Sequence, residues 1–263
     1  MRIAVKIGTS TLTHKTGRLN IRRVECLCKT LSDLKNAGHE IVLISSGAIG
    51  MGVGKMNLPG RPEDMPTKQA MAAVGQCELM YVYDKLFSEY HHTVAQILVT
   101  GEDLKTEPRH GNFIRTVLRL LELGALPIVN ENDTVATEEV AVGDNDTLGA
   151  LVAVSTGAEL YVILSDIDGL YTADPRTDPN AVVIPAVTEL TEEILAAGGG
   201  SGSALGTGGM ATKLSAARIC MDSGVDMAVM NGRDPEILYD AAEGKPVGTR
   251  FIGRRKRTDE KHK

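Results

Sequence analysis

The stretch RIAVKIGTST, residues 2–11, decides the fold of this chain. Its apolar residues form a nearly continuous run, which is typical of a strand buried on both faces of a parallel sheet. Lys6 interrupts the run, and a charge there is costly unless an anion or a carboxylate meets it. A glycine and two hydroxyl residues follow at 8–10, where the backbone can approach phosphate oxygens. Two interpretations stay open: Lys6 forms the floor of a phosphate site, or it extends to solvent from an edge strand.

The composition excludes several classes of protein. The chain has 263 residues, 43% of them hydrophobic, which suits one large α/β domain or two ordinary ones. A formal net charge of −6 argues against a dedicated nucleic-acid binder. No apolar run is long enough to span a bilayer, and the N-terminus lacks the pattern of a signal peptide. We therefore expect a cytoplasmic protein that does not bind membranes.

The cysteines and histidines give no sign of a disulfide framework or a metal centre. The six histidines show no metal-ligand spacing. The cysteines are scattered in apolar patterns, so we expect reduced thiols of the core at Cys26, Cys28, Cys77 and Cys220.

Strands and helices alternate along the chain. Apolar runs predict strands at 2–7, 39–44, 93–99, 126–129, 159–164, 226–230 and 247–252. Helical patterns occupy 20–36, 67–88, 111–123, 148–156 and 210–223, and prolines, glycines and charges mark 53–66 as a long loop. The alternation predicts an open, mainly parallel α/β sheet with helices on both faces. Polar clusters at 6–10, 45–50, 130–133 and 165–166 fall at strand ends, where ligands bind in such sheets.

Two lysines stand out near these clusters. Lys6 belongs to the first strand, and Lys213 follows a glycine-rich loop at the start of a helix, where an anion is favoured. The alternative for that loop is a flexible linker. Four aspartates lie near these lysines: Asp133, Asp144, Asp146 and Asp166. For any one of them, an ordinary role as a helix cap is the alternative. Taken together with the lysines, they predict a charge-balanced site. Phosphoryl transfer to an already ionised carboxylate, which needs no catalytic histidine, fits this residue set.

Seven motifs, in order along the chain, resemble those of the glutamate 5-kinase branch of the amino-acid kinase family. They are KIGTST (6–11), SSGAIGMG (45–52), KQAMAAVGQ (68–76), VNENDTV (129–135), VGDNDTL (142–148), SDIDGLYTADP (165–175) and GTGGMATKL (206–214). The resemblance implies a three-layer α/β/α sandwich with a mainly parallel open sheet over residues 1–253. It also implies ATP-dependent phosphorylation of the side-chain carboxylate of L-glutamate to L-glutamyl 5-phosphate, which begins proline biosynthesis.

The same resemblance implies roles for individual residues. Lys6 and Lys213 would flank the transferred phosphoryl group, and Asp146 would hold these lysines. The N-terminal part would bind glutamate through Ser46, Gly47, Asn130, Asp133 and Asn145. Asp133 suits the α-ammonium, while Ser46 and Asn145 can donate to a carboxylate. The C-terminal part would bind ATP, with Lys6, Gly8, Ser165, Asp166, Thr207, Gly208, Gly209, Met210, Ala211, Thr212 and Lys213 around the nucleotide. Mg²⁺ would bridge the ATP phosphates, with no protein residue assigned as its ligand.

Further expectations follow from the resemblance. It implies feedback inhibition by proline at the glutamate site and a homo-oligomer, either a dimer or a tetramer. Many relatives carry an additional PUA domain, and the chain resembles the form without one. Its basic last residues, 254–263, are expected to be a frayed tail that binds no nucleic acid. Two alternative functions stay open: a sister kinase acting on aspartate or N-acetylglutamate, and a catalytically silent sensor of an amino acid or a nucleotide.

Overall fold

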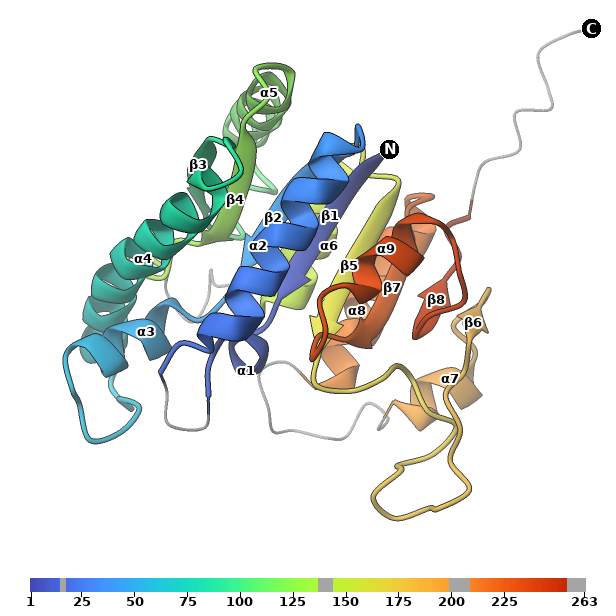
Figure 1. The fold of residues 1–263 in the computed structure, drawn as a ribbon. Helices are drawn as coiled ribbons and strands as arrows, with labels where there is room; N and C mark the ends of the chain where they lie inside the picture. Colours follow the sequence, from blue (N-terminus) through green and yellow to red (C-terminus); the bar gives the residue numbers. More distant parts are fainter. Residues whose placement is uncertain (15–17, 137–143, 199–208, 255–263) are drawn as a thin grey trace, which may run out of the picture.

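The sheet at the centre of the molecule is open and mainly parallel. The structure, a computed structural model, describes residues 1–14, 18–136, 144–198 and 209–254. Within them, eight strands form one sheet in the order β3-β4-β2-β1-β5-β7-β8-β6 (Figure 1). Neighbouring strands are parallel except β7 and β8, which are antiparallel. The strands are β1 (Arg2–Ile7), β2 (Glu40–Ser45), β3 (Val94–Val99), β4 (Leu126–Glu131), β5 (Leu160–Ser165), β6 (Ala186–Val187), β7 (Asp226–Asn231) and β8 (Thr249–Phe251).

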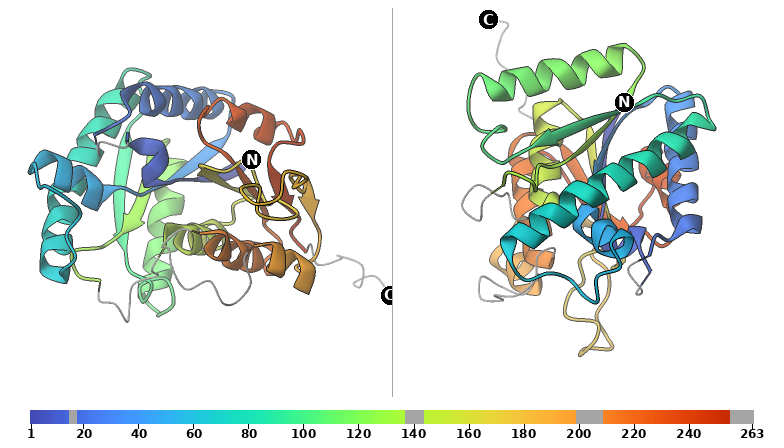
Figure 2. Two further views of the ribbon diagram at one scale, coloured as in Figure 1. Left: turned by 90° about the horizontal axis from the view of Figure 1, so that it is seen from below. Right: turned by 90° about the vertical axis from the view of Figure 1, so that its left-hand side faces the viewer.

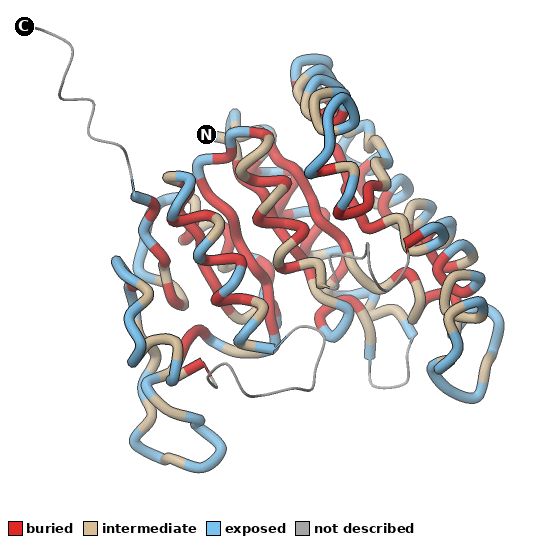
Figure 3. The backbone as a smooth tube through the Cα atoms, turned by 180° about the vertical axis from the view of Figure 1, so that it is seen from behind, coloured by how far each residue is buried: buried red, intermediate tan, exposed pale blue. Residues whose placement is uncertain are grey.

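Helices cover both faces of this sheet and confirm the predicted three-layer α/β/α sandwich (Figure 2). One layer contains α2 (Ile21–Asn36), α4 (Met65–Ser88) and α9 (Ile237–Ala242), and the opposite layer contains α5 (Arg109–Glu122), α6 (Asn145–Ser155) and α8 (Met210–Asp222). The central strands are buried along their length (Figure 3). In β1, Ile3 and Val5 pack toward the first layer and Ala4 toward the second. Because side chains alternate along a strand, Lys6 shares the face of Ala4 and is directed toward α6 and α8.

The segment predicted as a loop at 53–66 is shorter than expected. Helix α3 (Ala48–Lys55) continues to Lys55, and α4 begins at Met65, where the Asp64 carboxylate accepts a hydrogen bond from the backbone N–H of Thr67 at 2.8 Å. A Cβ added at Gly52 would lie 2.0 Å from the Met71 carbonyl oxygen, so this glycine allows the two helix backbones to touch. The prediction was wrong at the first end because helix–helix packing outweighs the low helix propensity of glycine, and at the second because Asp64 caps the helix before the predicted start.

Several other boundaries also differ from the sequence-based expectation. Strand β4 runs to Glu131, so Asn130 lies inside the strand rather than after it, and α6 begins at Asn145 rather than at Leu148. The short elements α1 (Thr9–Leu12), α7 (Glu192–Ala197), α9 and β6 were not predicted. Each spans six residues or fewer, which is too short for a clear periodic pattern.

The cysteines divide between core and surface. Cys28 and Cys220 are buried, Cys26 is partly buried, and Cys77 is exposed on α4. The expectation of a core thiol was therefore wrong for Cys77, which lies on the outer side of its helix. None of the described helices has the length and apolar composition that crossing a membrane requires.

Candidate active site

The ends of four parallel strands border one cavity of about 830 Å³. Its lining includes Lys6 from β1, Ser46 after β2, Asn130 from β4 and Ser165 from β5. These strands are neighbours in the sheet order β4-β2-β1-β5. The expectation that the four polar clusters meet at one edge of the sheet is confirmed.

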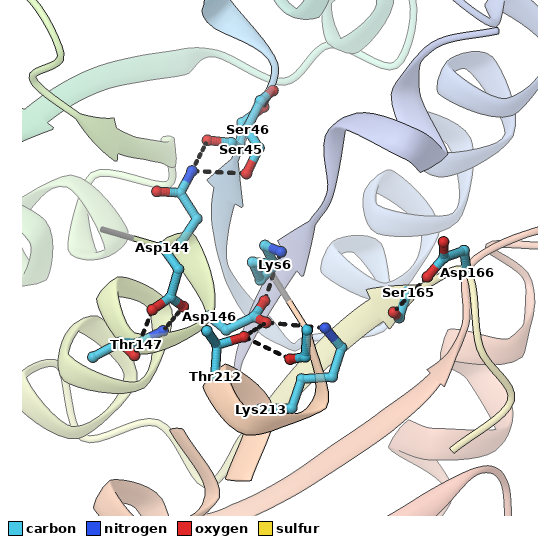
Figure 4. Close-up of polar contacts among 12 residues, drawn as sticks. Lys6, Ser45, Ser46, Asp144, Asp146, Thr147, Ser165, Asp166, Thr212 and Lys213 are labelled. Atoms are coloured by element: carbon cyan, nitrogen blue, oxygen red, sulfur yellow. Dashed lines mark hydrogen bonds and ion pairs between the residues drawn. The ribbon is translucent and has the colours of Figure 1, made fainter. Parts of the chain in front are cut away.

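Two lysines from opposite ends of the chain meet one aspartate in this cavity (Figure 4). The Lys6 Nζ atom lies 2.6 Å from Asp146 Oδ1, and the Lys213 Nζ atom lies 3.0 Å from Asp146 Oδ2. Lys6 is 8% exposed, Lys213 4% and Asp146 0%. The interpretation of Lys6 as an edge-strand lysine is wrong, since β1 lies between β2 and β5 and the ammonium group is buried beside its counter-ion.

The charge of Asp146 is stabilised by these two partners. Burial alone would raise the pKa of Asp146, but the charges of Lys6 and Lys213 outweigh burial and hold the pKa below its ordinary value. Asp146 also lies in the first turn of α6, where the helix dipole favours a negative charge. Thr212 strengthens the arrangement, because its Oγ1 donates a hydrogen bond to Asp146 Oδ2 at 2.9 Å.

A buried tyrosine fixes the turn that carries Asp146. The Tyr161 hydroxyl, from β5, donates to the backbone oxygen of Asp146 at 2.9 Å. A Cβ at Gly149 would lie 2.2 Å from that hydroxyl oxygen, so only a glycine allows this close approach. Burial, and secondarily the charge of Asp146, raises the pKa of Tyr161, which therefore stays a neutral donor.

A chain of side-chain amides forms the wall of the cavity next to the lysines. Asn145 Nδ2 lies 2.9 Å from the Ser45 carbonyl oxygen, 2.8 Å from Ser46 Oγ and 3.0 Å from Asn130 Oδ1. The Asn130 Oδ1 also accepts from the backbone N–H of Glu131 at 2.9 Å, and its Nδ2 donates to Gln76 Oε1 at 2.9 Å. Carbonyl oxygens and backbone N–H groups cannot exchange roles, so these fixed partners determine the orientation of both asparagine amides.

This orientation sets the hydrogen-bonding character of the wall. The Nδ2 of Asn145 faces protein acceptors, so its Oδ1 is the atom that can accept a hydrogen bond from a ligand donor, such as an ammonium group. Ser46 accepts from Asn145, which leaves the hydroxyl proton of Ser46 to donate. In this arrangement the Nδ2 of Asn145 is directed toward protein acceptors, while the Ser46 hydroxyl can still donate to a carboxylate.

Two further residues of the expected glutamate site border this wall. Gly47 lines the cavity and adopts φ = 99°, a left-handed conformation that favours glycine, at the turn between β2 and α3. Asp133 lines the cavity just beyond β4, and burial raises its pKa, partly offset by the positive charge of Arg61. A positively charged ligand in the cavity would stabilise the charged form of this partly buried carboxylate.

Comparisons with known proteins agree with this architecture. The sequence profile of the amino acid kinase family matches residues 1–231. The glutamate 5-kinase of Clostridium perfringens is 49% identical over 258 residues, which cover 97% of this chain and 96% of that protein. The glutamate 5-kinase of Carboxydothermus hydrogenoformans is 51% identical over 257 residues, which cover 97% of this chain and 69% of that protein.

The chain belongs to the glutamate 5-kinase family. Solved structures of more distant proteins share the fold. The UMP kinase of Bacillus anthracis matches with a TM-score of 0.66 at 15% identity, and the match covers 95% of this chain and 95% of that chain. The isopentenyl phosphate kinase of T. acidophilum has a TM-score of 0.61 at 17% identity, with 95% of this chain and 100% of that chain covered.

Ser165 and Asp166, two of the residues expected around the nucleotide, lie on the other side of the lysines from Ser46 (Figure 4). Gly8, Ser165 and Asp166 line the same cavity, and Ser165 Oγ donates to Asp166 Oδ1 at 3.3 Å. The first turn of α8 follows Gly209, its N-cap residue, and contains Met210, Ala211 and Thr212. Met210 packs against the core, and Thr212 contacts Asp146. Thr207 and Gly208 lie outside the described residues.

The structure adds three residues to those expected from the glutamate 5-kinase motifs. Gln76 and Tyr161 fix Asn130 and the start of α6, and Arg61 lines the cavity from the segment between α3 and α4. Gln76 and Tyr161 lie within apolar stretches, and a single polar residue in such a stretch does not indicate a functional site. Arg61 lies in a stretch of prolines and charges, which indicates a surface loop.

Proposed function

We propose that this chain transfers the γ-phosphoryl group of ATP to the side-chain carboxylate of L-glutamate, giving L-glutamyl 5-phosphate and ADP, the first step of proline biosynthesis. The observation that carries the proposal is the meeting of Lys6 and Lys213 on the buried carboxylate of Asp146 at the strand ends. Phosphoryl transfer depends mainly on positioning and on neutralising charge, and this arrangement supplies both. Membership in the glutamate 5-kinase family supports the choice of substrates.

The reaction needs no protein base. The side chain of free glutamate has an ordinary pKa of about 4.3, so its carboxylate is ionised at neutral pH and can attack phosphorus directly. The bond from phosphorus to the carboxylate oxygen forms as the bond to the oxygen bridging the β- and γ-phosphates breaks, and that oxygen leaves with ADP. An ammonium group has three N–H donors, so it can contact a carboxylate and phosphate oxygens at the same time. Lys6 and Lys213 then stabilise the charge on the transferring oxygens, while Asp146 keeps both lysines in place.

The polar wall beyond β2 and β4 suits the amino-acid substrate. Asp133 and the Oδ1 of Asn145 accept hydrogen bonds from the α-ammonium, and the Ser46 hydroxyl donates to a carboxylate oxygen. Asn130 orients Asn145. Gly47 allows the turn that brings Ser46 to the cavity. An N-acetylated substrate has no ammonium for Asp133, which favours glutamate over N-acetylglutamate.

The nucleotide occupies the side of the cavity toward β5 and α8. Ser165, Asp166 and Gly8 line this side of the cavity, and the N-terminus of α8, which begins at Met210, favours an anion. Glutamate is thus bound by the N-terminal part of residues 1–253 and ATP by the C-terminal part.

The residues present are compatible with magnesium bound through ATP. Among the described residues, no three His, Cys, Asp or Glu side chains are grouped to hold a metal ion. Mg²⁺ in kinases is commonly held by substrate phosphates and one or two carboxylates, and Asp166 offers a carboxylate at the cavity. When bound, the ion supplies further neutralisation of the phosphate charge.

The test is a substrate panel with the purified chain, ATP and magnesium. Hydroxylamine converts an acyl phosphate to a hydroxamate, so hydroxamate formation together with ADP release reports the product directly. We expect both with L-glutamate, and slower reaction with L-aspartate and N-acetylglutamate. Faster reaction with either of these, or glutamate binding without hydroxamate formation, would reject the proposed function.

Regulation and assembly are part of the same proposal. Proline carries a cationic amine and an α-carboxylate, so it fits the wall that receives the head group of glutamate, and inhibition competitive with glutamate is expected. We also propose a homo-oligomer, a dimer or a tetramer, which sedimentation measurements can test. The exposed Tyr81 of α4, with 63% of its surface accessible, is compatible with a subunit contact.

A further inference from the structure

Arg61 is a charged residue of the cavity to which the mechanism above gives no role. It lies in the segment between α3 and α4 and lines the same cavity as Ser46 and Asp133. Within the part of the chain that the structure describes, its side chain makes no hydrogen bond or ion pair with another residue. A guanidinium group presents five N–H donors in a planar fork that matches a carboxylate. Arg61 is therefore a ready donor for an anionic group that enters the cavity.

The presence of Asp133 in the same cavity indicates which type of anion Arg61 binds. Burial raises the pKa of Asp133, and the positive charge of Arg61 offsets part of that effect. Among the described residues these two side chains form no ion pair with each other, and both line the cavity, so opposite charges are available there to a ligand. The head group of an α-amino acid has the complementary pattern, with an ammonium and a carboxylate on one carbon. A ligand placed between the two residues satisfies both charges at once.

We propose that Arg61 binds the α-carboxylate of the amino-acid substrate while Asp133 binds its α-ammonium. The proposal rests on the function proposed above and adds the residue that selects α-amino acids. Held at both charges of its head group, glutamate directs its side-chain carboxylate toward Lys6 and Lys213. An ω-amino acid such as 4-aminobutyrate carries the same reacting carboxylate and an ammonium group, but it has nothing for Arg61 to bind.

The variant Arg61→Met tests this assignment with two ligands. The methionine side chain retains apolar bulk and removes the guanidinium donors. A hydrogen bond to a charged group contributes about 1.5–3 kcal/mol, so the KM for glutamate should rise about 10- to 100-fold. The inhibition constant of 4-aminobutyrate against glutamate should change less than twofold, and the KM for ATP should stay near the wild-type value. Arg61→Lys, which retains a positive charge, should recover part of the lost affinity.

Control measurements separate this role from a change in the loop and from failure of the proposed function. Glu63→Gln alters an exposed charge in the same segment and should leave both ligands unaffected. An equal loss of affinity for glutamate and 4-aminobutyrate in Arg61→Met, or a glutamate KM within twofold of the wild type, would overturn the role of Arg61. A wild-type chain that forms no acyl phosphate from glutamate would instead contradict the proposed function, independently of any variant.

Discussion

Replacing Asp146 by asparagine removes the one negative charge that Lys6 and Lys213 share. The amide retains the size of the carboxylate, so the change acts through charge rather than through a cavity. Asp146 is 0% exposed and both ammonium groups are buried. Removing one partner of a buried ion pair costs about 3–5 kcal/mol, because the other charge stays buried without its counter-ion. Since Asp146 contacts two buried lysines, we expect a loss within that range.

The expected loss is large enough for a thermal unfolding measurement. For a chain of this size, 1 kcal/mol corresponds to about 2–4 °C in the melting temperature, so Asp146→Asn should melt about 6–20 °C below the wild type. Adding ATP should raise the melting temperature of the variant more than that of the wild type, because phosphate oxygens replace the missing counter-ion and stabilise the folded state by mass action. Turnover should fall as well, because the carboxylate that contacts both lysines is gone.

Asp226→Asn provides a matched control. Asp226 is also buried, and it pairs with Arg250 at 2.9 Å at the start of β7, outside the lining of the cavity. This variant should lose stability but retain turnover, and ATP should stabilise it no more than the wild type. If Asp146→Asn melts within about 2 °C of the wild type, the account of a buried carboxylate shared by two lysines is incorrect.

Three further predictions concern the surroundings of these lysines. Asp133→Asn should raise the glutamate KM about 10- to 100-fold with little change in turnover. Burial raises the pKa of Asp133 above its ordinary value of 3.8, so in the wild type this carboxylate takes up a proton early during acidification. The affinity of the wild type for glutamate should therefore start to fall at a higher pH than the affinity of the variant. Gln76→Met removes the acceptor for Asn130 Nδ2 and should raise the glutamate KM several-fold, whereas an effect on the ATP KM alone would contradict the wall described here. Tyr161→Phe removes the donor to the Asp146 backbone oxygen and should lower the free energy of unfolding by about 1 kcal/mol or more, measured by urea titration.

The sequence predicted the edge of the sheet where the site lies, for a physical reason. Parallel strands end at one edge, so polar residues at the ends of neighbouring strands, such as Lys6, Ser46 and Ser165, can be predicted to meet in one cavity without knowledge of their contacts. The expected link of Asp146 to both lysines came from the resemblance to glutamate 5-kinases, and the structure places these three side chains in contact.

The contacts that sequence reasoning did not find depend on tertiary packing. Helix α3 extends into the expected loop because Gly52 allows it to pack closely against α4. That contact joins two separate helices, so the pattern of strands in the sequence does not reveal it. The amide polarity of Asn145 depends on the carbonyl of Ser45, a hundred positions earlier in the chain. Arg61 showed only loop composition, and that it lines the same cavity as Asp133 follows only from the tertiary fold.

The most direct test of the central claim is the rate of a single phosphoryl transfer in Lys213→Met, with ATP and glutamate bound at saturation. Removing one preorganised charge-stabilising donor typically lowers the chemical rate about 10²- to 10³-fold. We expect a decrease of that size, with the dissociation constant of glutamate changed less than about threefold, because the charge acts on the transition state more than on bound glutamate. A transfer rate within about threefold of the wild type would contradict the claim that the lysines gathered at Asp146 carry out the chemistry.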